Sequence, residues 1–176
     1  MAGIDESIDF HPLNIAILTI SDTRTMKNDK SGSVLQARAE TSGHRVVVRE
    51  ILSDDQDILV ARLKALIADD SVEVILTTGG TGVTGRDITP EAVEQVGDKH
   101  IPGFGELFRW LSYPLISTST IQSRATAVVA GGTYIFALPG SPGACKDAWD
   151  GILSSQLDIR HRPCNFAELI PRLREV

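Results

Sequence analysis

A glycine-rich run flanked by threonines is the segment whose residue types most clearly favour ligand chemistry. It comprises Thr77, Thr78, Gly79, Gly80, Thr81 and Gly82 and follows a short apolar run. Glycines let the backbone approach a ligand closely, and consecutive N–H groups can form a concavity that binds an anion. The spacing matches neither GxxxxGK followed by S or T nor GxGxxG, so no P-loop or dinucleotide motif is indicated. The run predicts either a phosphate-binding loop or a purely structural turn.

Two aspartates could add a metal ion to such a loop. Asp87 begins the stretch DITPEA, and Asp54 follows a run rich in β-branched residues. Magnesium takes oxygen ligands, typically one or two carboxylates together with phosphate oxygens and waters. Acidic residues are also favoured in the first turn of a helix by the helix dipole, which would equally explain Asp87, Glu91, Asp54 and Asp55. The pattern therefore leaves open a shared magnesium site at Asp54 and Asp87 or two ordinary helix starts.

Three further segments carry groups that could contact a ligand. Ser21 and Asp22 follow the first apolar run, and Pro139, Gly140 and Ser141 lie between a later apolar run and Pro142. The second segment is typical of a capped helix start, which could also direct its N–H groups at a phosphate. Ser123 and Arg124 form the third segment. The arginine is either a solvated surface group or a bidentate phosphate clamp.

The apolar patterning predicts the elements that hold these segments. Strands are expected over residues 13–20, 44–52, 72–77, 125–130 and 133–138, and helices over 31–42, from Ser53, from Thr89, over 104–111 and over 141–157. Gly131 and Gly132 are a two-residue hairpin signal. Alternating strands and helices favour a three-layer α/β/α sandwich whose sheet is mostly parallel, with the hairpin as an antiparallel edge. Ligands then bind beyond the carboxyl ends of the strands.

The composition narrows the class of protein. The chain has 176 residues, 42% of them hydrophobic and 23% charged, with a formal net charge of -6 and no lysine or arginine block. One soluble domain over residues 13–176, preceded by a loose arm over residues 1–12, is therefore expected, without nucleic acid as a partner. The two cysteines form no disulfide or zinc pattern. No apolar run suggests a signal peptide or a membrane span, which favours the cytoplasm.

Seven segments in a fixed order resemble the MoaB/Mog family of molybdenum cofactor biosynthesis proteins, which includes the G domain of gephyrin. They are residues 19–22 (TISD), 29–32 (DKSG), 76–82 (LTTGGTG), 86–92 (RDITPEA), 101–106 (IPGFGE), 123–124 (SR) and 138–141 (LPGS). The likeness covers roughly residues 13 to 157. The tail segments 156–158 (QLD) and 162–166 (RPCNF) are similar to those of the bacterial MoaB branch.

This resemblance implies an activity: adenylylation of molybdopterin with MgATP as substrate and release of pyrophosphate, by a homo-trimer or a hexamer. It implies that Asp54 and Asp87 are the catalytic residues. The implied substrate- and phosphate-binding residues are Ser21, Asp22, Ser31, Thr77 to Gly82, Glu91, Ser123, Arg124, Pro139, Gly140 and Ser141. Gly143 departs from the family, which often has a lysine or another polar residue there. A non-catalytic molybdopterin carrier and an unrelated nucleotide-binding or scaffolding protein are the alternatives.

Overall fold

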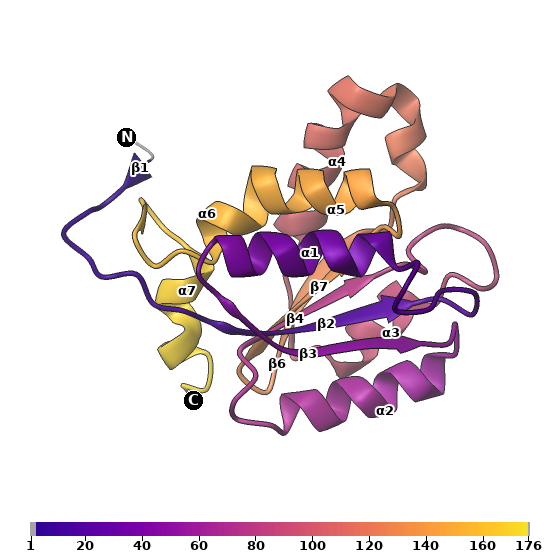
Figure 1. The fold of residues 1–176 in the computed structure, drawn as a ribbon, viewed down its shortest axis with the longest axis horizontal. Coiled ribbons are helices and arrows are strands. Elements are labelled where there is room, and N and C mark those ends of the chain that lie inside the picture. The colour runs from indigo at the N-terminus through magenta and orange to yellow at the C-terminus, as the bar shows by residue number, and fades with distance from the viewer. Residues whose placement is uncertain (1–2, 176) are drawn as a thin grey trace.

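The computed structural model describes residues 3–175 and contains a six-stranded sheet in the order β3-β2-β4-β7-β6-β5 (Figure 1). The strands are β2 (Asn14–Ile20), β3 (Arg45–Leu52), β4 (Val74–Thr78), β5 (Lys99–His100), β6 (Thr126–Ala130) and β7 (Thr133–Leu138). Strands β2, β3, β4 and β7 run parallel, whereas β6 and β5 are antiparallel to their neighbours. The predicted mostly parallel sheet is confirmed.

Helices cover both faces of this sheet (Figure 1). They are α1 (Lys30–Thr41), α2 (Gln56–Ile67), α3 (Thr89–Val96), α4 (Pro102–Ile116), α5 (Pro142–Ala148), α6 (Ser154–Gln156) and α7 (Phe166–Leu169). Alternate residues of β2 point to opposite faces: Ile17 packs in one core with α1, α4 and α5, and Leu18 packs in the other with α2 and α3. The structure is thus the predicted three-layer α/β/α sandwich.

The predicted hairpin is confirmed at β6 and β7. Gly131 and Gly132 have φ angles of 56° and 91°, which a two-residue turn of this kind requires and which glycine adopts without strain. The hairpin adds the antiparallel part of the sheet, but the two-residue strand β5 lies outside it and forms the actual edge.

Two predicted helix starts are displaced by tertiary contacts. Asp55, rather than Ser53, caps α2 and accepts a hydrogen bond from the Ile58 N–H at 3.0 Å. Thr89 does not cap α3: its hydroxyl donates to the Gly79 carbonyl at 2.7 Å, and Ile88 occupies the cap position. In both cases the chain before the helix is held by a loop from another strand, so the cap moves by one or two residues.

The segment before the sheet is attached to the end of the chain. Strand β1 (Gly3–Ile4) pairs antiparallel with β8 (His161–Arg162), and the guanidinium of Arg160 lies 5.0 Å from the centre of the Phe10 ring. The described part of the arm, from Gly3 onward, therefore docks on the C-terminal segment instead of lying loose. Within residues 3–175, no helix is both long and apolar enough to cross a membrane.

Candidate functional site

A cavity of about 520 Å³ lies beyond the carboxyl ends of β4 and β7. Its walls come from the glycine-rich loop after β4, from the end of α4 and the 3-10 helix Ser117–Gln122, and from the start of α5. Of the predicted site residues it brings together Gly80, Thr81, Gly82, Asp87, Ser123, Pro139, Gly140 and Ser141. The position agrees with the general rule that ligands bind at this end of an open α/β sheet.

Close contacts explain why the loop after β4 is rich in glycine. Gly79 and Gly80 have φ angles of 104° and 63°, a region that side chains rarely tolerate. A Cβ atom on Gly79 would lie 2.3 Å from the Ile20 carbonyl oxygen. The loop is therefore pressed against the end of β2, and its next residues, Gly80 to Gly82, face the cavity.

Asp87 is held against this loop by several donors. Its Oδ2 atom accepts hydrogen bonds from the Thr84 N–H at 2.8 Å and from the Thr84 hydroxyl at 2.7 Å. Burial tends to raise the pKa of Asp87, but the Thr84 bonds, a backbone bond from Gly82 and the charge of Arg124 outweigh it and lower that pKa. The carboxylate is thus ionised at neutral pH and faces the cavity.

Asp54 lies on the neighbouring loop and is tied to Asp22. The Asp22 N–H donates to Oδ2 of Asp54 at 3.1 Å, and the Asp54 N–H donates to Oδ1 of Asp22 at the same distance. Burial and, next, the negative charge of Asp87 raise the pKa of Asp54. Both aspartates therefore lie at the same end of the sheet and within electrostatic reach of each other, although Asp54 does not line the main cavity.

Asp54 and Asp87 are the carboxylates that a magnesium ion arriving with a polyphosphate would use, because the negative charge of Asp87 already acts on Asp54. Two acidic side chains that repel each other are relieved by a cation, and magnesium accepts one or two carboxylates when phosphates complete its shell. Over residues 3–175, no group of three or more His, Cys, Asp or Glu side chains is arranged to hold a metal ion. The chain alone therefore does not build a full magnesium cage, and Asp54 and Asp87 would be its protein ligands.

Arg124 is occupied by the protein itself. Its Nη2 atom donates to the Asp87 carbonyl at 2.6 Å, its Nε atom to the Gly82 carbonyl, and its Nη1 atom pairs with the Glu91 carboxylate. Neither Arg124 nor Glu91 lines the main cavity. In this arrangement each guanidinium nitrogen already donates to a protein group and the arginine shapes the loop from behind, while its role as a phosphate clamp stays a prediction.

The threonines before the glycines lie inside the sheet. Thr77 and Thr78 are fully buried, and their hydroxyls donate to the carbonyls of Phe136 at 3.4 Å and Pro139 at 2.9 Å. This differs from the expectation that these hydroxyls bind phosphate, because the strand continues to Thr78 and both hydroxyls already donate to carbonyls, although Thr78 also borders a smaller cavity.

The remaining predicted residues border two neighbouring hollows. A smaller cavity of about 230 Å³ is lined by Ser21, Ser31, Thr78, Gly79 and Gly140, and it adjoins the main cavity at Gly140. An open groove beside β3 contains Ser21, Asp22 and Ser53. The predicted residues thus gather at one end of the sheet but are divided between adjoining spaces.

The outer wall of the main cavity is formed by residues that no sequence motif indicated. This wall includes Phe108, Ser112, Leu115 and Ile116 from α4, and Asp147 from α5. Leu115 and Ile116 are 65% and 52% exposed, unusual for apolar residues at a helix end. Their signal in the sequence was weak, because the predicted helix stopped at residue 111 whereas α4 continues through Pro114.

Comparison with known proteins gives concordant matches. A family model described as "Probable molybdopterin binding domain" matches residues 16–159. Molybdenum cofactor biosynthesis protein B of Escherichia coli K12 is 49% identical over 160 residues, which are 91% of this chain and 94% of that protein. The protein of the same name from Bacillus subtilis is 42% identical over 142 residues, 80% of this chain and 84% of that protein.

Solved structures agree with the fold. A crystal structure of a molybdenum cofactor biosynthesis protein B has a TM-score of 0.85 and 38% identity, covering 94% of this chain and 98% of that chain. The tungsten cofactor synthesizing protein MoaB from Pyrococcus furiosus has a TM-score of 0.76 and 32% identity, covering 93% of this chain and 98% of that chain. The chain therefore belongs to the MoaB/Mog family of molybdenum cofactor biosynthesis proteins.

Proposed function

We propose that the protein acts in molybdenum cofactor biosynthesis, binds molybdopterin in the main cavity and adenylylates it with MgATP. The observation that carries this proposal is the convergence of the glycine-rich loop, Asp87 and the start of α5 on one cavity, in a chain whose family is described as molybdopterin binding. Backbone N–H groups and the first turn of a helix are suited to phosphate.

The proposed reaction is a nucleotidyl transfer. An oxygen of the terminal phosphate of the pterin attacks the α-phosphorus of ATP, the bond from that phosphorus to the bridging oxygen breaks, and pyrophosphate leaves with the electron pair. Because both reactants are anions, the site must position them and offset their charge. The loop from Gly80 to Gly82 would supply N–H donors, and Asp54 and Asp87 would hold the magnesium that accompanies ATP.

The apolar wall of the cavity supports a ligand with a flat ring. Phe108, Leu115 and Ile116 face the polar loops across the cavity. Ligand sites commonly combine such apolar surface with a few polar groups that fix orientation. The same cavity can therefore accept a ring on one side and a phosphate on the other.

A non-catalytic molybdopterin carrier is the second candidate. The observation in its favour is the charge of the cavity lining, which among the described residues includes Asp87 and Asp147 but no lysine, arginine or histidine. A polyphosphate would then be neutralised only by main-chain donors and by metal. A single phosphate, as on molybdopterin alone, carries less negative charge and needs fewer groups to neutralise it.

Turnover of purified protein separates the two candidates. Incubation with molybdopterin and MgATP is expected to release pyrophosphate and form the adenylylated pterin. Asp87→Ala and Asp54→Ala are each expected to lower the rate by about 100-fold or more, since each removes a group that organises the transition-state charge. Asp57→Ala, a change of an exposed carboxylate on α2, is the matched control.

Circular dichroism and a melting curve would show that each variant remains folded. Unchanged rates in both active-site variants would refute the assigned roles of the two aspartates. Molybdopterin binding by the wild-type protein without pyrophosphate release would instead establish the carrier.

A further inference from the structure

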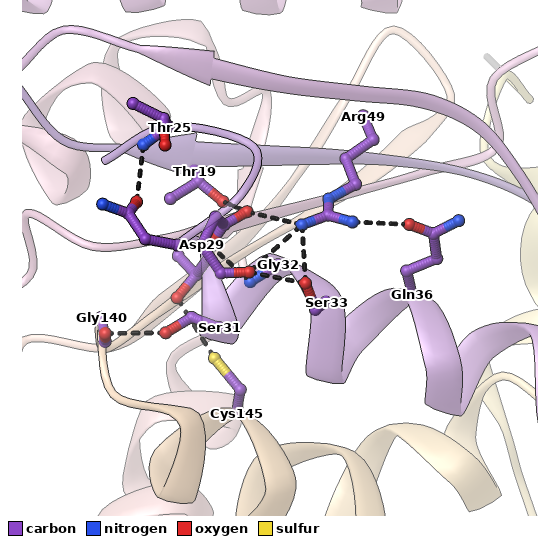
Figure 2. Close-up of polar contacts among 12 residues, drawn as sticks. Thr19, Thr25, Asp29, Ser31, Gly32, Ser33, Gln36, Arg49, Gly140 and Cys145 are labelled. Carbon is purple, nitrogen blue, oxygen red and sulfur yellow. Dashed lines mark hydrogen bonds and ion pairs between the residues drawn. The ribbon is translucent and has the colours of Figure 1, made fainter.

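A buried ion pair lies beside the main cavity: Asp29 borders the smaller adjoining cavity, and Arg49 borders the groove beside β3. The side chains of Asp29 and Arg49 are 1% and 16% exposed, and the Arg49 Nη2 atom lies 3.0 Å from Asp29 Oδ2. The same oxygen accepts a hydrogen bond from the Thr19 hydroxyl at 3.0 Å, while Asp29 Oδ1 accepts one from the Gly32 N–H at 2.9 Å (Figure 2). The carboxylate is therefore fixed by β2, β3 and α1 together.

Stability alone is a weak reason for this arrangement. Removing two charges from water is costly, and a buried ion pair often stabilises a protein no more than apolar residues of similar volume. The pair also requires a glycine beside it, because a Cβ atom on Gly32 would lie 2.2 Å from Asp29 Oδ2. In addition, the buried Nε atom of Arg49 has no hydrogen-bond partner among the described residues. The hydrogen bonds instead suit the pair to holding the first turn of α1 in a fixed position.

The first turn of α1 connects the pair to the cavity. Asp29 caps this helix, and Ser31, two residues later, donates from its hydroxyl to the Gly140 carbonyl at 2.8 Å (Figure 2). Gly140 borders the main cavity and packs so closely that a Cβ atom on it would lie 3.1 Å from the Gly79 Cα atom. A shift of α1 would therefore move the loop before α5 relative to the glycine-rich loop.

We propose that Asp29 and Arg49 are positioning residues that act through Ser31 to fix the spacing between the Gly140 loop and the loop from Gly79 to Gly82. Ser31 thereby acts on the protein rather than as a direct ligand of phosphate. The identity of the ligand between these loops rests on the proposed function, but the positioning itself is a property of the ligand-free protein.

Ser31→Ala and Ser154→Ala form a matched pair of variants for the test. Each removes one hydroxyl that donates to a carbonyl. The Ser154 bond, 3.3 Å long, stays within one helical segment because it ends on Asp150, whereas the Ser31 bond crosses to the other loop. Amide hydrogen exchange in the ligand-free protein is the first readout. Ser31→Ala is expected to speed exchange of the amides at 140, 141, 143 and 144 about two- to tenfold, the effect of one lost hydrogen bond, and Ser154→Ala to leave it unchanged.

Ligand affinity is the second readout. Titration with MgCl₂ and α,β-methylene-ATP, an analogue that cannot undergo the proposed transfer, is expected to show about two- to tenfold weaker binding for Ser31→Ala only. Unchanged exchange in Ser31→Ala would overturn the positioning role, and weaker binding with unchanged exchange would make Ser31 a direct ligand contact. If the wild-type protein does not bind the analogue, the proposed nucleotide chemistry fails while the exchange experiment still decides this inference.

Asp29→Asn tests the ion pair itself. It keeps an acceptor for the Gly32 N–H but leaves Arg49 without its counter-charge, so faster exchange at 140–144 is expected. When it is combined with Ser31→Ala the effects should not add, because both changes break the same connection. Additive effects would overturn the link between the pair and Ser31. If Asp29→Asn does not fold, the comparison of Ser31→Ala with Ser154→Ala decides alone.

Discussion

Close contacts leave no room for side chains at several positions of the glycine-rich loop. A Cβ atom on Gly82 would lie 2.7 Å from Oδ2 of Asp87, closer than such atoms approach in real structures. The absence of a side chain at this position therefore lets the carboxylate sit against the loop and accept the bonds from Thr84. The position of the Asp87 carboxylate therefore depends on the missing side chain at Gly82.

Gly82→Ala is predicted to displace the Asp87 carboxylate without unfolding the protein. We expect a loss of adenylyl transfer of at least about tenfold, because a displacement of about 1 Å in a reacting site can cost 100-fold. Gly85→Ala is the control, since a Cβ atom there meets nothing within 4 Å. Initial rates of pyrophosphate release measure the difference, and equal rates in the two variants would contradict the tight packing of Asp87 on Gly82.

At the end of the sheet opposite the main cavity, several elements pack around the buried side chain of His44. His44 follows α1, and its Nδ1 atom accepts a hydrogen bond from the N–H of Leu13, just before β2, at 3.1 Å. The rings of Phe10, from the arm, and Trp149, after α5, lie 5.2 Å and 6.1 Å from the His44 ring. Protonation of Nδ1 would remove the only acceptor for that N–H among these contacts, so the junction requires neutral imidazole.

This junction predicts acid sensitivity. Burial lowers the pKa of His44 from 6.5 to about 4, although the Asp158 charge opposes the shift. Since the folded pKa lies below the unfolded value, the stabilisation is fully present above pH 6.5 and is lost as the pH falls towards 4. The loss is at most about 3 kcal/mol. Melting temperatures between pH 7.5 and 4 measure it.

His44→Asn is expected to flatten this pH dependence, because the amide oxygen can accept the Leu13 N–H bond and does not titrate in this range. His100→Asn, at an exposed position on β5, should retain the wild-type slope. An unchanged slope in His44→Asn would assign the acid sensitivity to other groups.

At the scale of the whole molecule, the end of α4 and the following 3-10 helix project from the body (Figure 1). Trp110, Leu115 and Ile121 are 71%, 65% and 81% exposed. Apolar patches of this kind are typical of protein interfaces. We propose that this surface mediates the homo-trimer implied by the family resemblance, and because Leu115 also lines the main cavity, assembly would cover the cavity's outer wall.

Trp110→Asp is predicted to convert the assembly to monomers, since it places a charge in the proposed apolar interface. Sedimentation velocity should give three times the chain mass, or six times for a paired trimer, for the wild type and one chain mass for the variant. Ile58→Asp is the control: this residue is 47% exposed on α2, and an acidic residue suits the first turn of a helix. A monomeric wild type would refute the proposed surface.

The amino-acid sequence alone determined the local features of this protein. Apolar runs predicted the strands, Gly131 and Gly132 predicted the hairpin, and glycines next to Asp87 predicted a loop of functional interest, because these signals depend on neighbours along the chain. Segment order also indicated the family.

Only the tertiary structure decided which side chains face the cavity. It enclosed Thr77 and Thr78 in the sheet, turned Arg124 onto the carbonyls of Gly82 and Asp87 in the segment after β4, and joined Ser31 to Gly140 across 109 positions of the chain. The physical reason is that a buried polar group must find a hydrogen-bond partner, and the nearest partner in space belongs to another element that sequence spacing does not reveal.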